Sequence, residues 1–281
     1  MELIVFIGLI VFALIAGLLG SLLGLGGGII IIPALTLVFG YQIQVAIGAS
    51  LIGVIATSTG AASHYVQEEL TNIRLGMVLE TATTVGSIVG ALVAVYANQH
   101  LLAIAFGIFL VYGAIYMIRR PERLSPPAPL EDDGKSFKIR GNFFDRKLNK
   151  EVTYEVKNLD RGLVASAGAG IMSGLLGVGG GLIKVPVMNI WMGVPMKAAA
   201  ATSNFMIGVT ALAGTLVYYG YGFLSPLVSA IVAVGVFFGA TIGSRIAYLT
   251  TGTCLRKFFA VVMIAIAILM FLRGMGVLPT G

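Results

Sequence analysis

The sequence contains few charged residues and a single cysteine, and both shortages exclude classes of protein. Charged residues occupy 11% of the 281 positions, whereas about 25% is usual in a soluble domain. Cys254 is the only cysteine, which excludes an intramolecular disulfide and any metal site built from several cysteines. The two histidines, His64 and His100, are not at the spacing of metal ligands, and we expect neither a metal nor a cofactor.

In place of charge the chain has hydrophobic residues, which make up 58% of it and give a mean hydropathy of +0.98. Leu3 to Leu23 carries no charge and, at a rise of about 1.5 Å per helical residue, covers a hydrocarbon layer of about 30 Å. Residues 225–244 are also uncharged. Because backbone polar groups in hydrocarbon must pair within their own segment, these runs predict helices. We therefore expect an all-α polytopic membrane protein in the cell membrane, surrounded by the lipid bilayer.

The net charge of +6 suggests a nucleic-acid partner, but the distribution of the charges argues against one. Eleven of the 18 Lys and Arg residues lie between Arg119 and Arg161, mixed with eight acids, which is typical of a solvated loop. Residues 119–160 form the only extended polar stretch, and their basic flanks place it in the cytoplasm. Within it, Phe137–Phe144 and Val152–Val156 alternate in a way that predicts a small β-hairpin.

An internal repeat is the most informative feature of the chain. Shifting the sequence by 153 residues places Leu22–Pro33 on Leu175–Pro186, with eight of the twelve positions identical. The register holds without a gap over about seventy residues, which indicates a duplication. We predict a first membrane repeat over residues 1–118, the polar loop at 119–160 and a second membrane repeat over 161–281.

Each repeat contains five apolar segments, which gives eight to ten membrane segments in all. The count depends on the second segment of each repeat, which is short and is either half of a broken helix or a re-entrant piece. If every segment crosses, the repeats have opposite orientation; if the short ones do not, the repeats are parallel. Placing Lys197, Arg256 and Lys257 with Arg74 in the cytoplasm favours the inverted arrangement. The predicted segments are 2–23, 29–40, 45–66, 75–98 and 101–118, then 162–176, 182–193, 197–219, 225–248 and 255–272.

Two glycine clusters, GLGGG at 24–28 and GVGGG at 177–181, occupy matched positions of the repeats. A dinucleotide fingerprint would need a preceding strand and a downstream acid, which are missing. Each glycine costs a helix about 1 kcal/mol, so the clusters predict helix breaks at the repeat interface. The half-helix after each break, with Pro33 or Pro186 ending its first turns, would point its positive dipole end at an anion. The alternative is that the glycines only let helices pack closely.

Further motifs follow each glycine cluster. The segments SLLGLGGGIIIIP and GLLGVGGGLIKVP are followed at equal distance by VAIGASL and AAAATSNF, and SHYVQEELTNIRLG comes after the third apolar segment. Through these motifs the sequence resembles the sulfite exporter TauE/SafE family of membrane transporters, over nearly the whole chain apart from residues 119–160. The resemblance implies export or uptake of a small anion, such as sulfite, a sulfonate or another organic anion, coupled to an ion.

Small and polar residues form one face of the third apolar segment. Ser50, Thr57 and His64 recur there at helical spacing, with glycines between them. Hydroxyl groups next to the glycine breaks could donate to an oxyanion or serve helix packing; for Thr57 and Thr210 we expect packing. The predicted anion-binding residues are Gly26, Gly27, Gly28, Ser50, Gly179, Gly180, Gly181, Lys184, Thr202, Ser203 and Asn204.

Three charged residues in the apolar segments lack a counterpart in the other repeat. Glu80 matches Ala233, and an acid inside a membrane costs roughly 3 kcal/mol or more. It is a candidate for proton coupling, as is His64; the alternatives for Glu80 are a structural pair or a place at the cytoplasmic end. Lys184 matches Ile31 and would complement the half-helix dipole for an anion. Arg245 is expected at the membrane interface.

These features predict a secondary transporter that moves a small anion across the cytoplasmic membrane, coupled to an ion such as the proton. A passive anion channel is the alternative. We do not expect an enzyme, because the sequence has no Ser/His/Asp set, no HExxH and no paired catalytic acids. The sequence does not decide whether the protein forms a homo-oligomer, and we expect no nucleic-acid partner.

Overall fold

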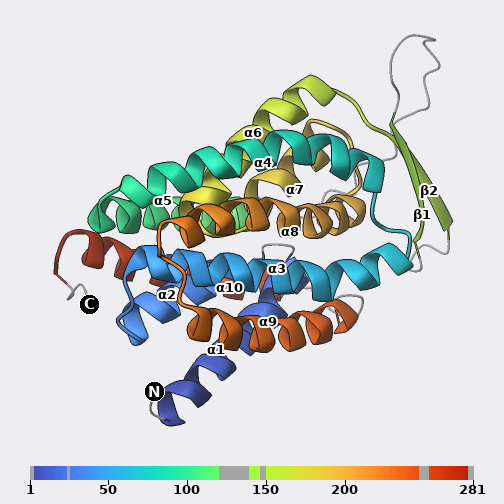
Figure 1. Cartoon of the computed structure of the whole chain (residues 1–281). Helices are drawn as coiled ribbons and strands as arrows, with labels where there is room; N and C mark the ends of the chain where they lie inside the picture. The colour runs from blue at the N-terminus through green and yellow to red at the C-terminus, as the bar shows by residue number, and fades with distance from the viewer. Residues whose placement is uncertain (1–2, 24–25, 120–138, 146–149, 247–252, 278–281) are drawn as a thin grey trace.

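The computed structural model describes residues 3–23, 26–119, 139–145, 150–246 and 253–277. They form a bundle of helices with one small hairpin at its end (Figure 1). Six of the described helices are long and apolar enough to cross a membrane, and shorter apolar helices lie among them. The chain is therefore an all-α polytopic membrane protein, as the composition predicted.

The helices follow the predicted apolar segments, with a break after the first helix of each half. The first half contains α1 (Leu3–Leu23), α2 (Gly28–Pro33), a π-helical turn η1 (Ala34–Val38), α3 (Ile43–Gln67), α4 (Ile73–Tyr96) and α5 (Gln99–Arg119). The second half contains α6 (Leu159–Leu176), α7 (Gly181–Ile190), α8 (Met196–Gly220), α9 (Pro226–Ile246) and α10 (Thr253–Gly274). Pro33 ends α2 as predicted, but α7 continues past Pro186, which removes only one helical hydrogen bond.

Two pairs of matching helices, α3 with α8 and α5 with α10, lie against each other in opposite directions. In the α3–α8 pair, the Ser58 hydroxyl donates to the carbonyl oxygen of Asn204 at 2.6 Å. Gly48, nearer the start of α3, lies against Tyr218 near the end of α8. In the α5–α10 pair, a ring nitrogen of His100 at the start of α5 lies 3.1 Å from the carbonyl oxygen of Gly274 at the end of α10. These directions support the inverted arrangement of the repeats.

The other close interfaces pair α4 with α6 and α1 with α9, and they depend on small residues. Gly86 of α4 lies against Ala167 of α6, and Gly90 lies against Ile171, so the two helices run in the same direction (Figure 1). A Cβ atom on either glycine would overlap a carbonyl oxygen of α6. Small residues bring helix backbones together where lipid removes the hydrophobic drive for association. The matching glycines of the α1–α9 interface are Gly17, Gly239 and Gly243.

A β-hairpin from the polar loop closes one end of the bundle. Strands β1 (Arg140–Asp145) and β2 (Lys150–Glu155) pair antiparallel within the predicted stretch, while residues 120–138 and 146–149 of the loop lie outside the described residues. Tyr154 accepts a hydrogen bond of 3.3 Å from the amide of Asn72, whose side chain caps α4. Burial raises the pKa of Tyr154, and the bond from Asn72 opposes that rise. The hairpin is thereby fixed to the start of α4.

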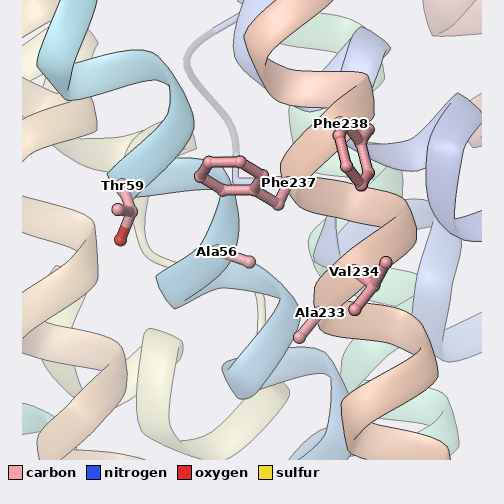
Figure 2. Close-up of a pocket in the computed structure, with 6 residues that line it drawn as sticks. All are labelled: Ala56, Thr59, Ala233, Val234, Phe237 and Phe238. Atoms are coloured by element: carbon pink, nitrogen blue, oxygen red, sulfur yellow. The ribbon is translucent and has the colours of Figure 1, made fainter.

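The surface of the bundle is apolar, and one shallow groove in it lies between α3 and α9 (Figure 2). Phe238 on its rim is 57% exposed, an exposure that suits contact with lipid tails. Ala233, one of the residues that line the groove, is the repeat counterpart of Glu80, so the groove shows what the second half has in place of that acid. Its lining residues are Ala56, Thr59, Ala233, Val234, Phe237 and Phe238.

The close contact of α4 with α6 predicts the result of a matched pair of substitutions on α6. Gly170→Ala should lower the free energy of unfolding by about 1–3 kcal/mol, because its methyl group would overlap the carbonyl oxygen of Thr83. Gly168→Ala has no atom near its new methyl group and should be neutral or stabilising by up to about 1 kcal/mol. Thermal unfolding in detergent measures both. Equal effects of the two substitutions would contradict this packing.

Candidate functional site

Glycine backbone conformation produces the break in each half. Gly26 and Gly27 have φ angles of 81° and 74°, and their repeat counterparts Gly179 and Gly180 have 73° and 71°. This left-handed region favours glycine because it has no Cβ atom. Helices α2 and α7 then begin at Gly28 and Gly181. The described residues of both breaks are buried, as broken backbone in a membrane requires.

The two breaks lie against the same pair of residues at the centre of the bundle. Gly26 and Gly179 both adjoin Val54 of α3 and Ile207 of α8, which are repeat counterparts. The hydroxyl of Ser50 donates to the carbonyl oxygen of Gly177 at 2.8 Å, beside Gly28. Ser50 therefore satisfies a carbonyl freed by the second break. The side chains that a Cβ atom would meet at Gly26 and Gly179 are aliphatic, and the Thr57 hydroxyl lies 3.4 Å from the carbonyl oxygen of Gly26. The charged, more polar part of the site lies elsewhere.

That polar part begins at Lys184, in the first turns of α7. Its side chain is only 1% exposed. The ammonium nitrogen donates to the hydroxyl oxygen of Thr210 on α8 at 2.8 Å and lies 3.8 Å from the Oε2 atom of Glu80 on α4. Glu80 and Lys184 each lack a charged counterpart in the other repeat. The two unmatched charges are partners.

Glu80 is 8% exposed and receives hydrogen bonds from two threonine hydroxyls. Its Oε1 atom accepts from Thr210 at 2.7 Å and from Thr84 at 3.2 Å. A carboxylate that accepts two hydroxyl bonds next to an ammonium group suits the ionised form. Thr210 therefore links the cation and the anion, donating to one and accepting from the other. We call Glu80, Lys184 and Thr210 the charged cluster.

The remaining predicted residues at the start of α8 divide into two groups. Thr202 accepts a hydrogen bond of 3.0 Å from the backbone N–H of Asn72, so it joins α8 to α4. Asn204 is fully buried, and among the described residues neither polar atom of its side chain has a hydrogen-bond partner. The Ser203 hydroxyl is also buried. Ser203 is the repeat counterpart of Ser50, and the counterpart of Gly177, which accepts from Ser50, is Gly24, which lies outside the described residues. An unpaired buried amide costs about 1–3 kcal/mol, so Asn204 is suited to hold water or a polar solute.

Comparisons with known proteins agree with this architecture. The sulfite exporter TauE/SafE family model matches residues 9–270. The chain belongs to the TauE/SafE family. It is 30% identical over 248 residues to the probable membrane transporter protein YunE of Bacillus subtilis, covering 86% of this chain and 88% of that protein. A probable membrane transporter protein of Methanocaldococcus jannaschii is 26% identical over 253 residues, 85% of each chain. No solved structure matches this sequence.

In this TauE/SafE protein, the second coupling candidate, His64, lies away from the charged cluster. It is in the last turn of α3, six residues beyond Ser58. Ser58 contacts Asn204 of the antiparallel α8, and Thr210 is six residues from Asn204 in the opposite direction. At about 1.5 Å per residue the two side chains are separated by roughly 18 Å along the helices. Arg245, expected at the interface, is exposed in the last turn of α9.

Sequence reasoning missed two polar roles in this TauE/SafE protein. Thr210 was expected to serve packing, but its hydroxyl forms the centre of the charged cluster. Arg273 received no role, yet its buried guanidinium donates to the carbonyl oxygens of Thr36 and Tyr41 next to η1. The sequence held a signal for the ion pair but none for Thr210. Glu80 is an unmatched acid, and Lys184 is an unmatched cation directly after a glycine break.

The link through Thr210 predicts the outcome of an isosteric substitution. Thr210→Val should lower the free energy of unfolding by about 1–3 kcal/mol, because Lys184 and Glu80 each lose a buried hydrogen bond. Thr215→Val on the same helix is the control, since the Thr215 hydroxyl donates only to the Ala211 carbonyl of its own helix. Its effect should stay below about 1 kcal/mol. Thermal unfolding in detergent compares the two, and a larger effect at Thr215 would contradict the assigned role.

Proposed function

We propose that this TauE/SafE protein is a secondary transporter that moves a small anion, such as sulfite, a sulfonate or a related sulfur oxyanion, across the cytoplasmic membrane. The observation that carries the proposal is the burial of Lys184 directly after the second glycine break. A lysine with no exposed surface needs an anionic partner, since an isolated buried charge costs several kcal/mol. In the present conformation Glu80 is that partner. During transport the substrate takes the same place.

Several further groups suit an oxyanion at this place. The first turn of α7 presents backbone N–H groups and the positive end of its helix dipole close to Lys184. The Thr210 hydroxyl lies 2.8 Å from the ammonium nitrogen and can donate to a bound oxygen. Asn204, six residues before Thr210 and about 9 Å along α8, has a buried amide without a partner among the described residues. A cation, a helix N-terminus and neutral donors together favour an anion over a cation.

The arrangement of the helices favours a carrier over an open pore. Lys184 is almost completely buried and Glu80 is only 8% exposed, so the pair is largely shielded from solvent in this conformation, unlike groups that line an open pore. The opposite directions of α3 and α8 and of α5 and α10 support inverted repeats, which in many transporters rock around a central site. The same symmetry would expose the charged cluster first to one side and then to the other. We propose that this cycle is coupled to an ion.

The hairpin end of the bundle is proposed to face the cytoplasm. The contact of Thr202 with Asn72 brings the starts of α4 and α8 to that end. Arg74 and Lys197 lie in the first turns of these helices, so basic residues gather there, in keeping with the positive-inside rule. The side chains of Arg256 and Lys257, used in the sequence prediction, lie outside the described residues.

Reconstitution in liposomes tests the proposed function. Sulfite and methanesulfonate flux is measured with and without a pH gradient. Accumulation above the equilibrium concentration, driven by the gradient, is expected of a coupled transporter. Flux that only equilibrates the two sides would instead favour a passive anion channel. Absence of flux for both anions would exclude the proposal.

Lys184 and Arg245 are two basic residues of the second half, the first buried and the second exposed, so the effects of replacing them can be compared. Lys184→Ala should reduce the initial rate of anion uptake by roughly 10–100-fold, because it removes a charged hydrogen-bond donor from the site. Arg245→Ala should change the rate less than about twofold, since that side chain is exposed at the end of α9. Uptake is normalised to protein that runs as a single species in detergent. Equal or reversed effects would remove Lys184 from the site.

A further inference from the structure

The charged cluster is electrically neutral when empty. Lys184 carries one positive charge and Glu80 one negative charge, and Thr210 connects them by hydrogen bonds of 2.8 and 2.7 Å. All three side chains are buried. An anion that binds Lys184 beside an ionised Glu80 would leave one uncompensated negative charge in the bundle, at a cost of several kcal/mol. Anion binding therefore requires a change at Glu80.

Building on the transport function proposed above, we propose that the substrate displaces Glu80 from Lys184, and that Glu80 takes up a proton as it is displaced. One proton then travels with each monovalent anion, and the empty and loaded clusters are both neutral. The proton binds the carboxylate on the side where the anion enters and leaves with the anion on the other side. No other charge needs to cross the membrane.

The two carboxylate oxygens of Glu80 have unequal surroundings, which identifies the atom that takes the proton. Oε1 accepts from both Thr84 and Thr210. Oε2 faces Lys184 at 3.8 Å and, among the described residues, receives no hydrogen bond. It is therefore the oxygen with an unused lone pair on the side of the cation. A proton on Oε2 removes the attraction to Lys184, while Oε1 can keep the hydrogen bond from Thr84.

Thr210 can follow the exchange without moving its helix. Its hydroxyl has one proton, and three acceptors lie within reach: Oε1 of Glu80 at 2.7 Å, the Met206 carbonyl at 3.1 Å and the Thr83 hydroxyl at 3.3 Å. When Glu80 is ionised, the first is the strongest acceptor. When Glu80 is neutral, rotation about one bond turns the hydroxyl toward the incoming anion or to Met206. Thr210 is thus a positioning residue between the two charges.

Among the described charged residues on the helices around Glu80, Lys184 lies next to it, and the others lie near the helix ends. Within the described residues, α6 contributes Asp160 and Arg161, and α8 contributes Lys197, all in the first turn of their helices. Where α6 packs on α4 near Glu80, it presents the backbone of Ala167 and Gly170. Arg74 lies in the first turn of α4 itself. Lys184 is therefore the charged group that lies next to Glu80 in this conformation.

The same charge accounting predicts which anions fit. A monovalent anion with protonated Glu80 gives a neutral cluster, whereas a divalent anion leaves one negative charge buried. The site should therefore select monovalent sulfonates and hydrogen sulfite over divalent oxyanions such as sulfate. This selection follows from charge alone and does not depend on the size of the substrate.

The test uses the full-length protein in liposomes with radiolabelled methanesulfonate. In the wild type, a gradient of one pH unit, acidic on the side of the anion, should drive about tenfold accumulation. A potassium–valinomycin voltage of either sign should leave the accumulation unchanged, because the loaded cluster is neutral. Sulfate uptake should be at least about tenfold slower. A response to voltage, or equal rates for the two anions, would overturn the inference.

Glu80→Gln separates this inference from the proposed function. The variant should still exchange labelled for unlabelled methanesulfonate, because Lys184 remains, but it should lose accumulation driven by the pH gradient. Glu151→Gln in the exposed hairpin is the control and should behave as the wild type. If Glu80→Gln retains pH-driven accumulation, the inference is wrong while the transport function stands. If the wild type moves neither methanesulfonate nor sulfite, both fail. The voltage measurement on the wild type remains decisive should the variant not fold.

Discussion

The burial of broken backbone is the constraint on which the rest of this structure depends. A helix that stops inside a membrane exposes N–H and C=O groups that lipid cannot pair. Here the two breaks solve the problem jointly, since Gly26 and Gly179 share Val54 and Ile207 as neighbours and Ser50 pairs with the carbonyl of Gly177. Each half thus covers the weak point of the other. Neither break could lie in lipid on its own, so the two breaks depend on each other for burial.

Much of this fold is readable from the sequence because it depends on local pattern. Apolar runs set the helices, glycine runs set the breaks, and the repeat shows that both occur twice. The hairpin also lies within the stretch where side chains alternate. Pro186 shows the limit of local rules, because α7 continues past it once the neighbouring helices hold that segment in place. A proline removes one hydrogen bond, and packing decides whether the helix ends.

The candidate site was readable only in part, because its contacts join residues far apart in the chain. Lys184 was identified by its position after a glycine break, but nothing in the sequence fixes the rotation of α4 that brings Glu80 to it. For the same reason Thr210 could not be told from Thr57. Both lie on equivalent faces, yet Thr57 donates to the carbonyl of Gly53, while Thr210 links two charges. Serine and threonine in membrane helices take either role, and their spatial neighbours decide which.

The two halves of the molecule provide their own comparison of a charged and an apolar version of one place. Where the second half has Lys184, the first has Ile31, and where the first has Glu80, the second has Ala233 beside an apolar groove (Figure 2). The apolar version packs within the same bundle without an ion pair. Replacing a buried ion pair by apolar residues is often neutral or stabilising. A charge pair that the architecture can do without, kept beside a glycine break, is best explained by what it binds.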